Sequence, residues 1–161
     1  MTPIEKRVTP SPMSSALSLD NMPAVVTRFI ELYRVLNKHN LYLLDEVYAK
    51  EVIFTDPMHS IHGVDALRAY FAKLYQNVES IHFDIHDVVA SDSQAALYWV
   101  MEYRHPKLNR GHSIRVDGMS RLKFNDKIEF HRDYFDLGQM LYEQVPCLGK
   151  LIGLVKGKAA Q

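Results

Sequence analysis

Three ionisable and two aromatic side chains precede Asp136 in the run from His131 to Asp136, which reads His-Arg-Asp-Tyr-Phe-Asp. The surrounding residues predict a strand of a hydrophobic sheet, and a strand projects alternate side chains to opposite faces. His131 and Asp133 are therefore expected on one face together with Glu129. A His beside an Asp can handle protons as an acid-base pair. A solvated or simply hydrogen-bonded pair is the alternative interpretation.

A second carboxylate follows an earlier predicted strand, residues 51–56. Val52, Phe54 and Asp56 alternate onto one face of that strand, and Pro57 ends it. If this face is the buried one, Asp56 points into the interior. The loop that follows contains His59 and His62, which could border a pocket or belong to an ordinary surface loop.

A third polar group, His82, Asp84 and His86, also alternates along a predicted strand. Side chains two residues apart on a strand lie about 7 Å apart. That spacing favours a row over the converging shell that a metal ion needs. We therefore predict no metal site and no cofactor.

The overall composition limits the classes of partner. The 161 residues carry 19 Lys and Arg against 19 Asp and Glu, and 47% of them are hydrophobic, which suits a single domain with a real core. A chain without net charge is not expected to bind nucleic acid. No apolar run approaches the ~20 residues that span a bilayer, so no integral membrane segment is predicted. The single Cys147 fits a reducing, cytoplasmic location.

The elements that must position these residues follow from periodicity. Residues 1–20 are rich in Pro, Ser and Thr and are expected to form a disordered leader. Helical spacing then predicts helices, and four long alternating runs joined by short turns predict antiparallel strands. The expected helices cover 23–36, 41–48 and 64–74, and the four strands cover 81–90, 94–105, 112–124 and 127–136. A broken helix is expected after Leu137.

Helices followed by a meander of long strands indicate an α+β fold, in which a curved antiparallel sheet wraps around the N-terminal helices to form a cone. We assign residues 21–145 to this domain and residues 146–161 to a C-terminal extension. The extension carries leucines beside lysines. It is expected to pack over the open end of the cone or against a partner, with weak membrane-surface contact as the alternative.

Three motifs accompany this order of helices and strands: Phe54-Thr55-Asp56-Pro57, Gly63-Val64-Asp65-Ala66-Leu67 and Arg132-Asp133-Tyr134-Phe135-Asp136. In the order of its elements and in these motifs, the chain resembles the nuclear transport factor 2-like superfamily and its SnoaL-like branch over roughly residues 22–142. The resemblance implies the cone fold and an apolar pocket. Within the superfamily, the ketosteroid isomerases carry their proton-transferring Asp in an Asp-Pro, which corresponds to Asp56. The limonene epoxide hydrolases end their last strand in a motif that matches Asp133.

The match to either enzyme family is incomplete. Ketosteroid isomerases place a Tyr on the first helix, where this chain has Phe29, with Tyr33 one turn later. Epoxide hydrolases need an Arg-x-Asp on the second long strand, where this chain has Trp99 and Met101. Epoxide hydrolysis is therefore not predicted. SnoaL-like cyclases use a single Asp as acid and base in an apolar pocket, which one carboxylate beside His131 would satisfy.

The sequence thus predicts a pocket for a small hydrophobic molecule. The favoured function is cofactor-free acid-base catalysis of the isomerase or cyclase kind; a non-catalytic ligand-binding or assembly module is the alternative. A homodimer through the outer face of the sheet is expected. The candidate catalytic residues are Asp133, His131 and Asp56, and the expected pocket wall is Phe29, Tyr33, Phe54, Trp99, Met101 and Phe135.

Overall fold

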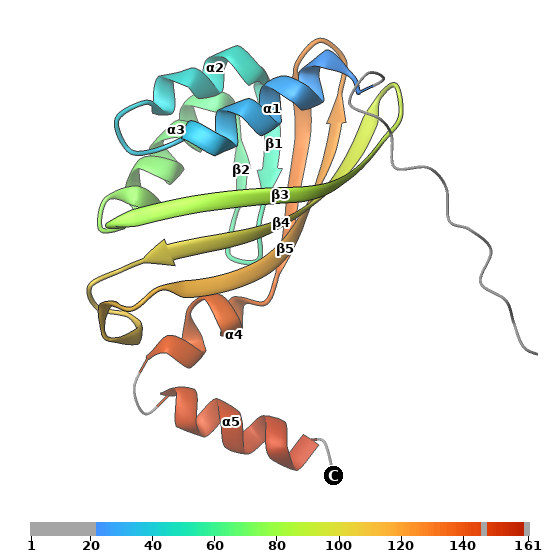
Figure 1. The fold of residues 1–161 in the computed structure, drawn as a ribbon. Coiled ribbons are helices and arrows are strands. Elements are labelled where there is room, and N and C mark those ends of the chain that lie inside the picture. Colours follow the sequence, from blue (N-terminus) through green and yellow to red (C-terminus); the bar gives the residue numbers. More distant parts are fainter. Residues whose placement is uncertain (1–21, 146–147, 160–161) are drawn as a thin grey trace, which may run out of the picture.

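The computed structural model describes residues 22–145 and 148–159. The expected leader and Cys147 lie outside these residues. Helices cover one face of a strongly curved sheet, and a last helix extends away from the body (Figure 1). The helices are α1 (Ala24–Val35), α2 (Leu44–Val47), α3 (Val64–Tyr75), α4 (Leu137–Met140) and α5 (Leu148–Ala159). The strands are β1 (Tyr48–Thr55), β2 (Ser60–His62), β3 (Ser80–Ala90), β4 (Gln94–Arg104), β5 (Ile114–Phe124) and β6 (Ile128–Phe135).

The sheet has six strands in the order β2-β1-β6-β5-β4-β3. Neighbouring strands from β3 to β6 are joined by short turns and pair antiparallel, as the turns predict. The expectation of a purely antiparallel sheet is wrong at one place, because β1 and β6 pair in parallel. A long stretch of chain separates these two strands, which is what a parallel neighbour requires.

The loop predicted after Asp56 is partly a strand. Residues 60–62 form β2, which pairs with the end of β1 as a short edge strand. Three residues are too few for alternation to be recognised in the sequence, so the prediction of a loop is wrong here. Both histidines of this segment, His59 and His62, are exposed.

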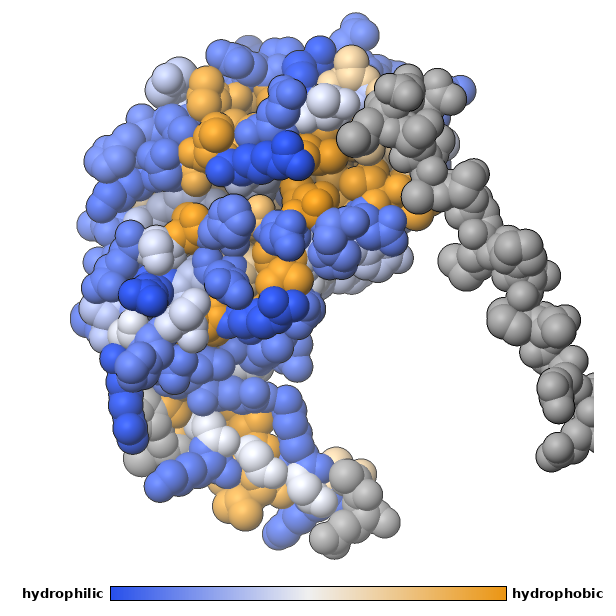
Figure 2. All heavy atoms as spheres, in the orientation of Figure 1, coloured by the Kyte–Doolittle hydropathy of each residue, from blue (hydrophilic) through white to orange (hydrophobic). Residues whose placement is uncertain are grey.

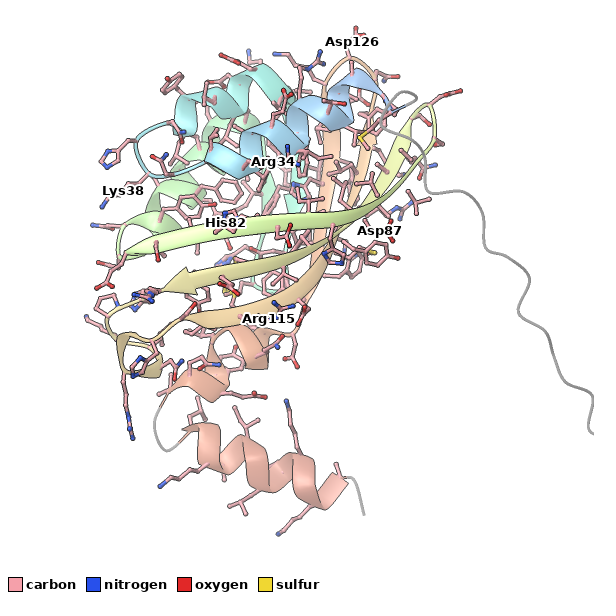
Figure 3. All side chains as sticks on the ribbon, viewed as in Figure 1. Arg34, Lys38, His82, Asp87, Arg115 and Asp126 are labelled. Atoms are coloured by element: carbon pink, nitrogen blue, oxygen red, sulfur yellow. The ribbon has the colours of Figure 1, made fainter. Side chains whose placement is uncertain are left out.

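The N-terminal helices pack their apolar stripes on the concave face of the sheet. Val26, Phe29, Ile30 and Tyr33 recur at helical spacing on α1 and are all buried. The turn between β5 and β6, where Asp126 is labelled in Figure 3, reaches α1: the guanidinium of Arg28 donates to the Asp126 carbonyl at 2.6 Å. A second buried cluster gathers around Trp99, Met101 and Tyr103 at the other end of the sheet.

A bulge in β6 decides which side chains face inward. The pairing with β5 shifts between Phe130 and Ile128, so that Glu129 is an extra residue. Ile128 is consequently buried and Glu129 exposed. The prediction that Glu129 shares the face of His131 is therefore wrong, because alternation restarts at the bulge.

The residues after β6 cover one end of the sheet, and helix α5 then extends away from it. Asp136 caps α4, since its Oδ1 accepts hydrogen bonds from the backbone N–H groups of Gly138 and Gln139 at 2.7 and 3.2 Å. Helix α5 contacts mainly the turn Tyr142–Gln144, and Lys156 forms an ion pair with Glu143. Figure 2 shows hydrophobic atoms exposed along α5. In the described residues α4, and not the extension, borders the interior.

Among residues 22–145 and 148–159, no helix combines the length and the apolar character needed to cross a bilayer.

Candidate functional site

A cavity of about 300 Å³ lies where the two buried clusters meet, between α1, α3, α4 and the concave face of the sheet. This volume is at the lower end of the range for small-molecule pockets. Five of the six residues expected on the pocket wall line it. The wall includes Tyr33, Phe54, Asp56, Phe71, Tyr75, Phe83, Trp99, Met101, Tyr103, Asp133, Phe135 and Met140.

Phe29 is the sixth expected wall residue, and the structure places it elsewhere. Its side chain is 1% exposed in the core beneath the cavity, where it stacks on Tyr33 at 4.4 Å between ring centroids. The turn of α1 that follows brings Tyr33 to the wall. The helical spacing correctly put both residues on the buried face, but it does not tell which one reaches the cavity.

Asp133 presents one fixed oxygen and one open oxygen. Oδ1 accepts hydrogen bonds from Ser120 Oγ at 2.5 Å and lies 2.7 Å from His131 Nε2. No described residue donates a hydrogen bond to Oδ2. The side chain is 17% exposed and lines the cavity. The arrangement fixes the carboxyl group and leaves Oδ2 free to contact a ligand.

His131 is wholly buried and serves as the link behind Asp133. Its ring lies among aromatic side chains, 4.9 Å from Phe54 and 5.3 Å from Phe29 between ring centroids, both edge to face. Nδ1 lies 2.7 Å from the Tyr48 hydroxyl. Both ring nitrogens are therefore hydrogen-bonded, as a buried imidazole requires.

A row of hydroxyl groups continues from His131 to α1. The Tyr48 hydroxyl lies 2.8 Å from that of Tyr33, whose side chain lines the cavity. Burial raises the pKa of both tyrosines well above the usual value, and the Asp133 charge adds to the effect. Both hydroxyls therefore keep their protons and can act as donors.

The other side of Asp133 is held by Ser120 and Trp99. The indole Nε1 donates to Ser120 Oγ at 2.9 Å, and both residues are buried. The indole fits because Gly118 lies opposite it on β5: a Cβ at Gly118 would lie 2.2 Å from Trp99 Cη2. Gly118 therefore makes room for the ring that positions Ser120.

The Trp99 indole and the Asp133 carboxylate fix the hydrogen position between them. An indole N–H can only donate and an ionised carboxylate can only accept, so the Ser120 hydroxyl donates to Asp133. With a neutral imidazole, His131 donates from Nε2 to Asp133, its Nδ1 accepts from the Tyr48 hydroxyl, and Tyr48 accepts from Tyr33. The row of six side chains is satisfied with a neutral imidazole and an ionised carboxylate.

Asp56 lies at the same cavity but is held by three donors. Oδ1 accepts from the backbone N–H groups of Met58 and His59 at 2.7 and 2.8 Å, which closes the turn after β1. Oδ2 accepts a short hydrogen bond from the hydroxyl of Tyr70. The side chain is buried, as the alternation of β1 predicts. These contacts leave Asp56 less available to a ligand than Asp133.

The structure brings together Asp133 and His131 directly and places Asp56 on another part of the same wall. Sequence reasoning missed Tyr48, Ser120 and Tyr75. Tyr48 stands at the boundary between α2 and β1, where periodicity changes, and Ser120 is an ordinary strand residue without a distinguishing pattern. For Tyr48 and Ser120, the alternation with buried neighbours along the strand was the one sequence signal for an inward orientation.

The histidines of the loop after β1 and of β3 do not line the cavity. His59 and His62 do not line it, although the His59 ring lies 5.1 Å from Tyr70. His82, labelled in Figure 3, and His86 are exposed on β3, while Phe83 between them faces inward. In the described ranges, no three His, Cys, Asp or Glu side chains gather closely enough to hold a metal ion.

Comparison with known proteins gives a family match over most of this domain. The family model of the SnoaL-like domain matches residues 26–131. No curated protein matches the chain.

Solved structures resemble the whole fold at low sequence identity. A hypothetical protein with a ketosteroid isomerase-like fold from Catenulispora acidiphila, in complex with trimethylamine, is 16% identical, with a TM-score of 0.65 and coverage of 78% of this chain and 95% of that chain. A putative SnoaL-like polyketide cyclase from Shewanella putrefaciens is 18% identical, with a TM-score of 0.63 and coverage of 74% and 94%. TerC, co-crystallised with polyporic acid, is 12% identical, with a TM-score of 0.60 and coverage of 70% and 91%.

These likenesses establish the fold. The predicted α+β cone is confirmed.

Proposed function

The chain belongs to the SnoaL-like domain family, and we propose that it binds a small apolar carbonyl compound and moves protons on it without a cofactor. Asp133 is the proposed proton carrier. The observation that carries this assignment is the state of its carboxyl group, in which Oδ1 is fixed by Ser120 and His131 while Oδ2 has no donor among the described residues. An open carboxylate oxygen in an apolar cavity suits a general base.

The proposed reaction begins when Asp133 Oδ2 takes a proton from the carbon beside the carbonyl group. The C–H bond breaks, an O–H bond forms on Asp133, and the electron pair moves to the carbonyl oxygen to give an enolate. In an isomerase, Asp133 returns the proton to a different carbon. In a cyclase, the enolate carbon attacks a second carbonyl carbon, and the proton goes to the new alkoxide. Neither sequence consumes an oxidant or a reductant.

His131 is assigned a supporting role in this proposal. Its hydrogen bond to Oδ1 keeps the carboxyl group in one orientation. Because the imidazole is enclosed by aromatic rings, it has no direct access to a ligand. We therefore propose His131 as a positioning residue.

Asp56 is assigned a structural role. Three donors from its own turn and from Tyr70 occupy its oxygens. Both oxygens of Asp56 are engaged in these contacts, whereas Asp133 Oδ2 has no donor among the described residues. This argument favours Asp133 over Asp56 as the base.

A deuterium exchange assay tests the assignment without knowledge of the natural substrate. 1-Tetralone, a compact apolar ketone, is incubated in D₂O, and mass spectrometry follows deuterium uptake at the carbon beside its carbonyl. We expect the protein to accelerate uptake over buffer and Asp133→Asn to lose about 100-fold of the acceleration. Asp117→Asn is the matched control, because Asp117 is exposed on the outer face beside Arg115.

Each outcome of this assay is decisive. Loss of exchange in Asp56→Asn but not in Asp133→Asn would move the base to Asp56. Binding of 1-tetralone without exchange would favour the alternative, a non-catalytic binding module. One observation also supports that alternative: most polar groups at the cavity form hydrogen bonds with one another. Absence of both binding and exchange would reject the ligand class.

We also propose a homodimer through the outer face of the sheet. Tyr98, Met119 and Tyr134 are direct neighbours across β4, β5 and β6, and both tyrosines are exposed. Such a row is a suitable centre for an interface between two copies. Sedimentation velocity is expected to show a dimer that Met119→Glu converts to a monomer. A wild-type monomer would reject this proposal.

A further inference from the structure

Helix α5 presents most of its large apolar side chains to solvent. Leu148, Leu151, Leu154 and Val155 are 39%, 58%, 65% and 60% exposed. The other three lie three or four residues from Leu151, which places all four on one side of the helix. Figure 2 shows hydrophobic atoms along this helix. An apolar stripe of this kind normally packs against another surface, so its exposure needs an explanation.

The opposite side of α5 is attached to the domain. Gly149 packs so closely against the backbone of Glu143 that a larger side chain would clash. Lys156 forms an ion pair with the Glu143 carboxylate, and Ile152, one turn from both Gly149 and Lys156, is partly buried. These contacts fix the orientation of the helix. Its apolar stripe therefore faces away from the body of the domain, from which α5 extends in Figure 1.

Two lysines border the apolar stripe. Lys150 and Lys158 lie one turn before and one turn after Leu154, and both are exposed. The ion pairs that α5 forms with described residues all involve Lys156. The helix contains no Asp or Glu. Its outward side is therefore both apolar and positively charged.

We propose that α5 lies on the surface of a membrane that contains anionic phospholipids. The stripe enters the boundary between headgroups and acyl chains, while Lys150 and Lys158 contact lipid phosphates. The helix has 12 residues and is about 18 Å long, so it lies in the membrane plane and does not cross the ~30 Å hydrocarbon core. This surface is separate from the cavity, and the inference does not depend on the proposed function.

A second copy of the chain is a less suitable occupant of this surface. Pairing of two outward sides would bring the lysines of both helices together, and α5 supplies no carboxylate to compensate their charge. Lipid headgroups offer negative charge along the whole helix. The charge of this side therefore favours a membrane over self-association.

Vesicle flotation with the full-length protein tests the inference. The vesicles contain either phosphatidylcholine alone or equal parts of phosphatidylcholine and the anionic phosphatidylglycerol. We expect the protein to bind the mixed vesicles about 10-fold or more tightly than phosphatidylcholine alone, and added salt to weaken this binding. A variant with both Lys150→Gln and Lys158→Gln is expected to lose most of the preference for the mixed vesicles.

Val155→Glu tests the apolar contact. The new carboxylate would meet acyl chains and anionic headgroups, so we expect binding to the mixed vesicles to weaken about 10-fold or more. Val35→Glu on α1 is the matched control, because Val35 is similarly exposed, at 55%, and the substitution makes the same change in charge. This control is expected to bind like wild type.

Three results would overturn the inference. The first is an absence of wild-type binding to the mixed vesicles. The second is an equal loss in Val35→Glu and Val155→Glu, because the contact would then not depend on α5. The third is self-association in sedimentation velocity that Val155→Glu abolishes, without vesicle binding, which would assign the outward side of α5 to a second copy.

Discussion

His131 Nε2 lies 2.7 Å from Asp133 Oδ1, two residues further along the same strand, and this contact joins the cavity wall to a buried row of hydroxyl groups. Behind it, Nδ1 lies 2.7 Å from the Tyr48 hydroxyl. The imidazole thus lies between a carboxylate and a phenol. We expect one of its nitrogens to donate a hydrogen bond and the other to accept one.

The first prediction concerns the tautomer of His131. An acceptor-only carboxylate on one side and a phenol donor on the other require the proton on Nε2 and a bare Nδ1. Nitrogen-15 NMR should show the Nε2–H tautomer near neutral pH. A proton on Nδ1 would contradict the direction of hydrogen bonding derived for the whole row.

The second prediction concerns the loss of Tyr48 from the row. In Tyr48→Phe, His131 Nδ1 loses its donor and Tyr33 loses its acceptor, and both groups are buried. We expect the free energy of unfolding to fall by about 1–3 kcal/mol. Urea denaturation measures it.

Tyr42→Phe is the control for this experiment. The Tyr42 side chain is 63% exposed, so its loss should change stability by less than about 0.5 kcal/mol. Equal effects of the two substitutions would mean that the buried row contributes no net stability.

The third prediction concerns the contact between Gly118 and Trp99. Gly118→Ala places a methyl group inside the indole ring's present volume, with 2.2 Å to Cη2. We expect a loss of about 1–3 kcal/mol in stability. Because Trp99 must move away from Ser120, its fluorescence emission should also shift.

Gly153→Ala provides the matched control for that substitution. A Cβ at Gly153 meets no atom within 4 Å on α5. This change should stabilise the helix by about 0.5–1 kcal/mol and leave Trp99 emission unaltered. An unaltered emission spectrum in Gly118→Ala as well would show that the ring is not confined there.

The fourth prediction concerns alkaline pH. Burial raises the pKa of Tyr103 to about 12, against 10.0 for the unperturbed group. The folded state thus holds this proton more tightly, and the resulting stability is fully present below pH 10 and is lost as pH rises toward 12. Tyr33, Tyr48, Tyr70 and Tyr75 shift in the same direction.

Urea denaturation between pH 9 and pH 12 should therefore show a steep fall in stability above about pH 10. Tyrosine absorbance should show the ionisation of these side chains coinciding with unfolding. Ionisation well before unfolding would contradict their burial.

The sequence determined most of the elements and which candidate side chains share a face of one strand. Helical spacing located α1 and α3, and turn residues between long alternating runs located β3 to β6, since both signals are local. Alternation placed His131 and Asp133 together on β6 and Asp56 on the buried face of β1. These relations need only the geometry of one strand, in which side chains two residues apart share a face.

Tertiary structure decided which residues of other strands lie beside these candidate side chains. Tyr48 is 83 residues from His131 in sequence, and their contact depends on the parallel pairing of β1 with β6, which no local pattern specifies. The bulge at Glu129 and the place of Ser120 beside Asp133 depend likewise on strand register. Register is set by long-range pairing and packing. The sequence therefore predicted a carboxylate and a histidine on one face, and the fold alone placed Ser120 and Tyr48 within hydrogen-bonding distance of them.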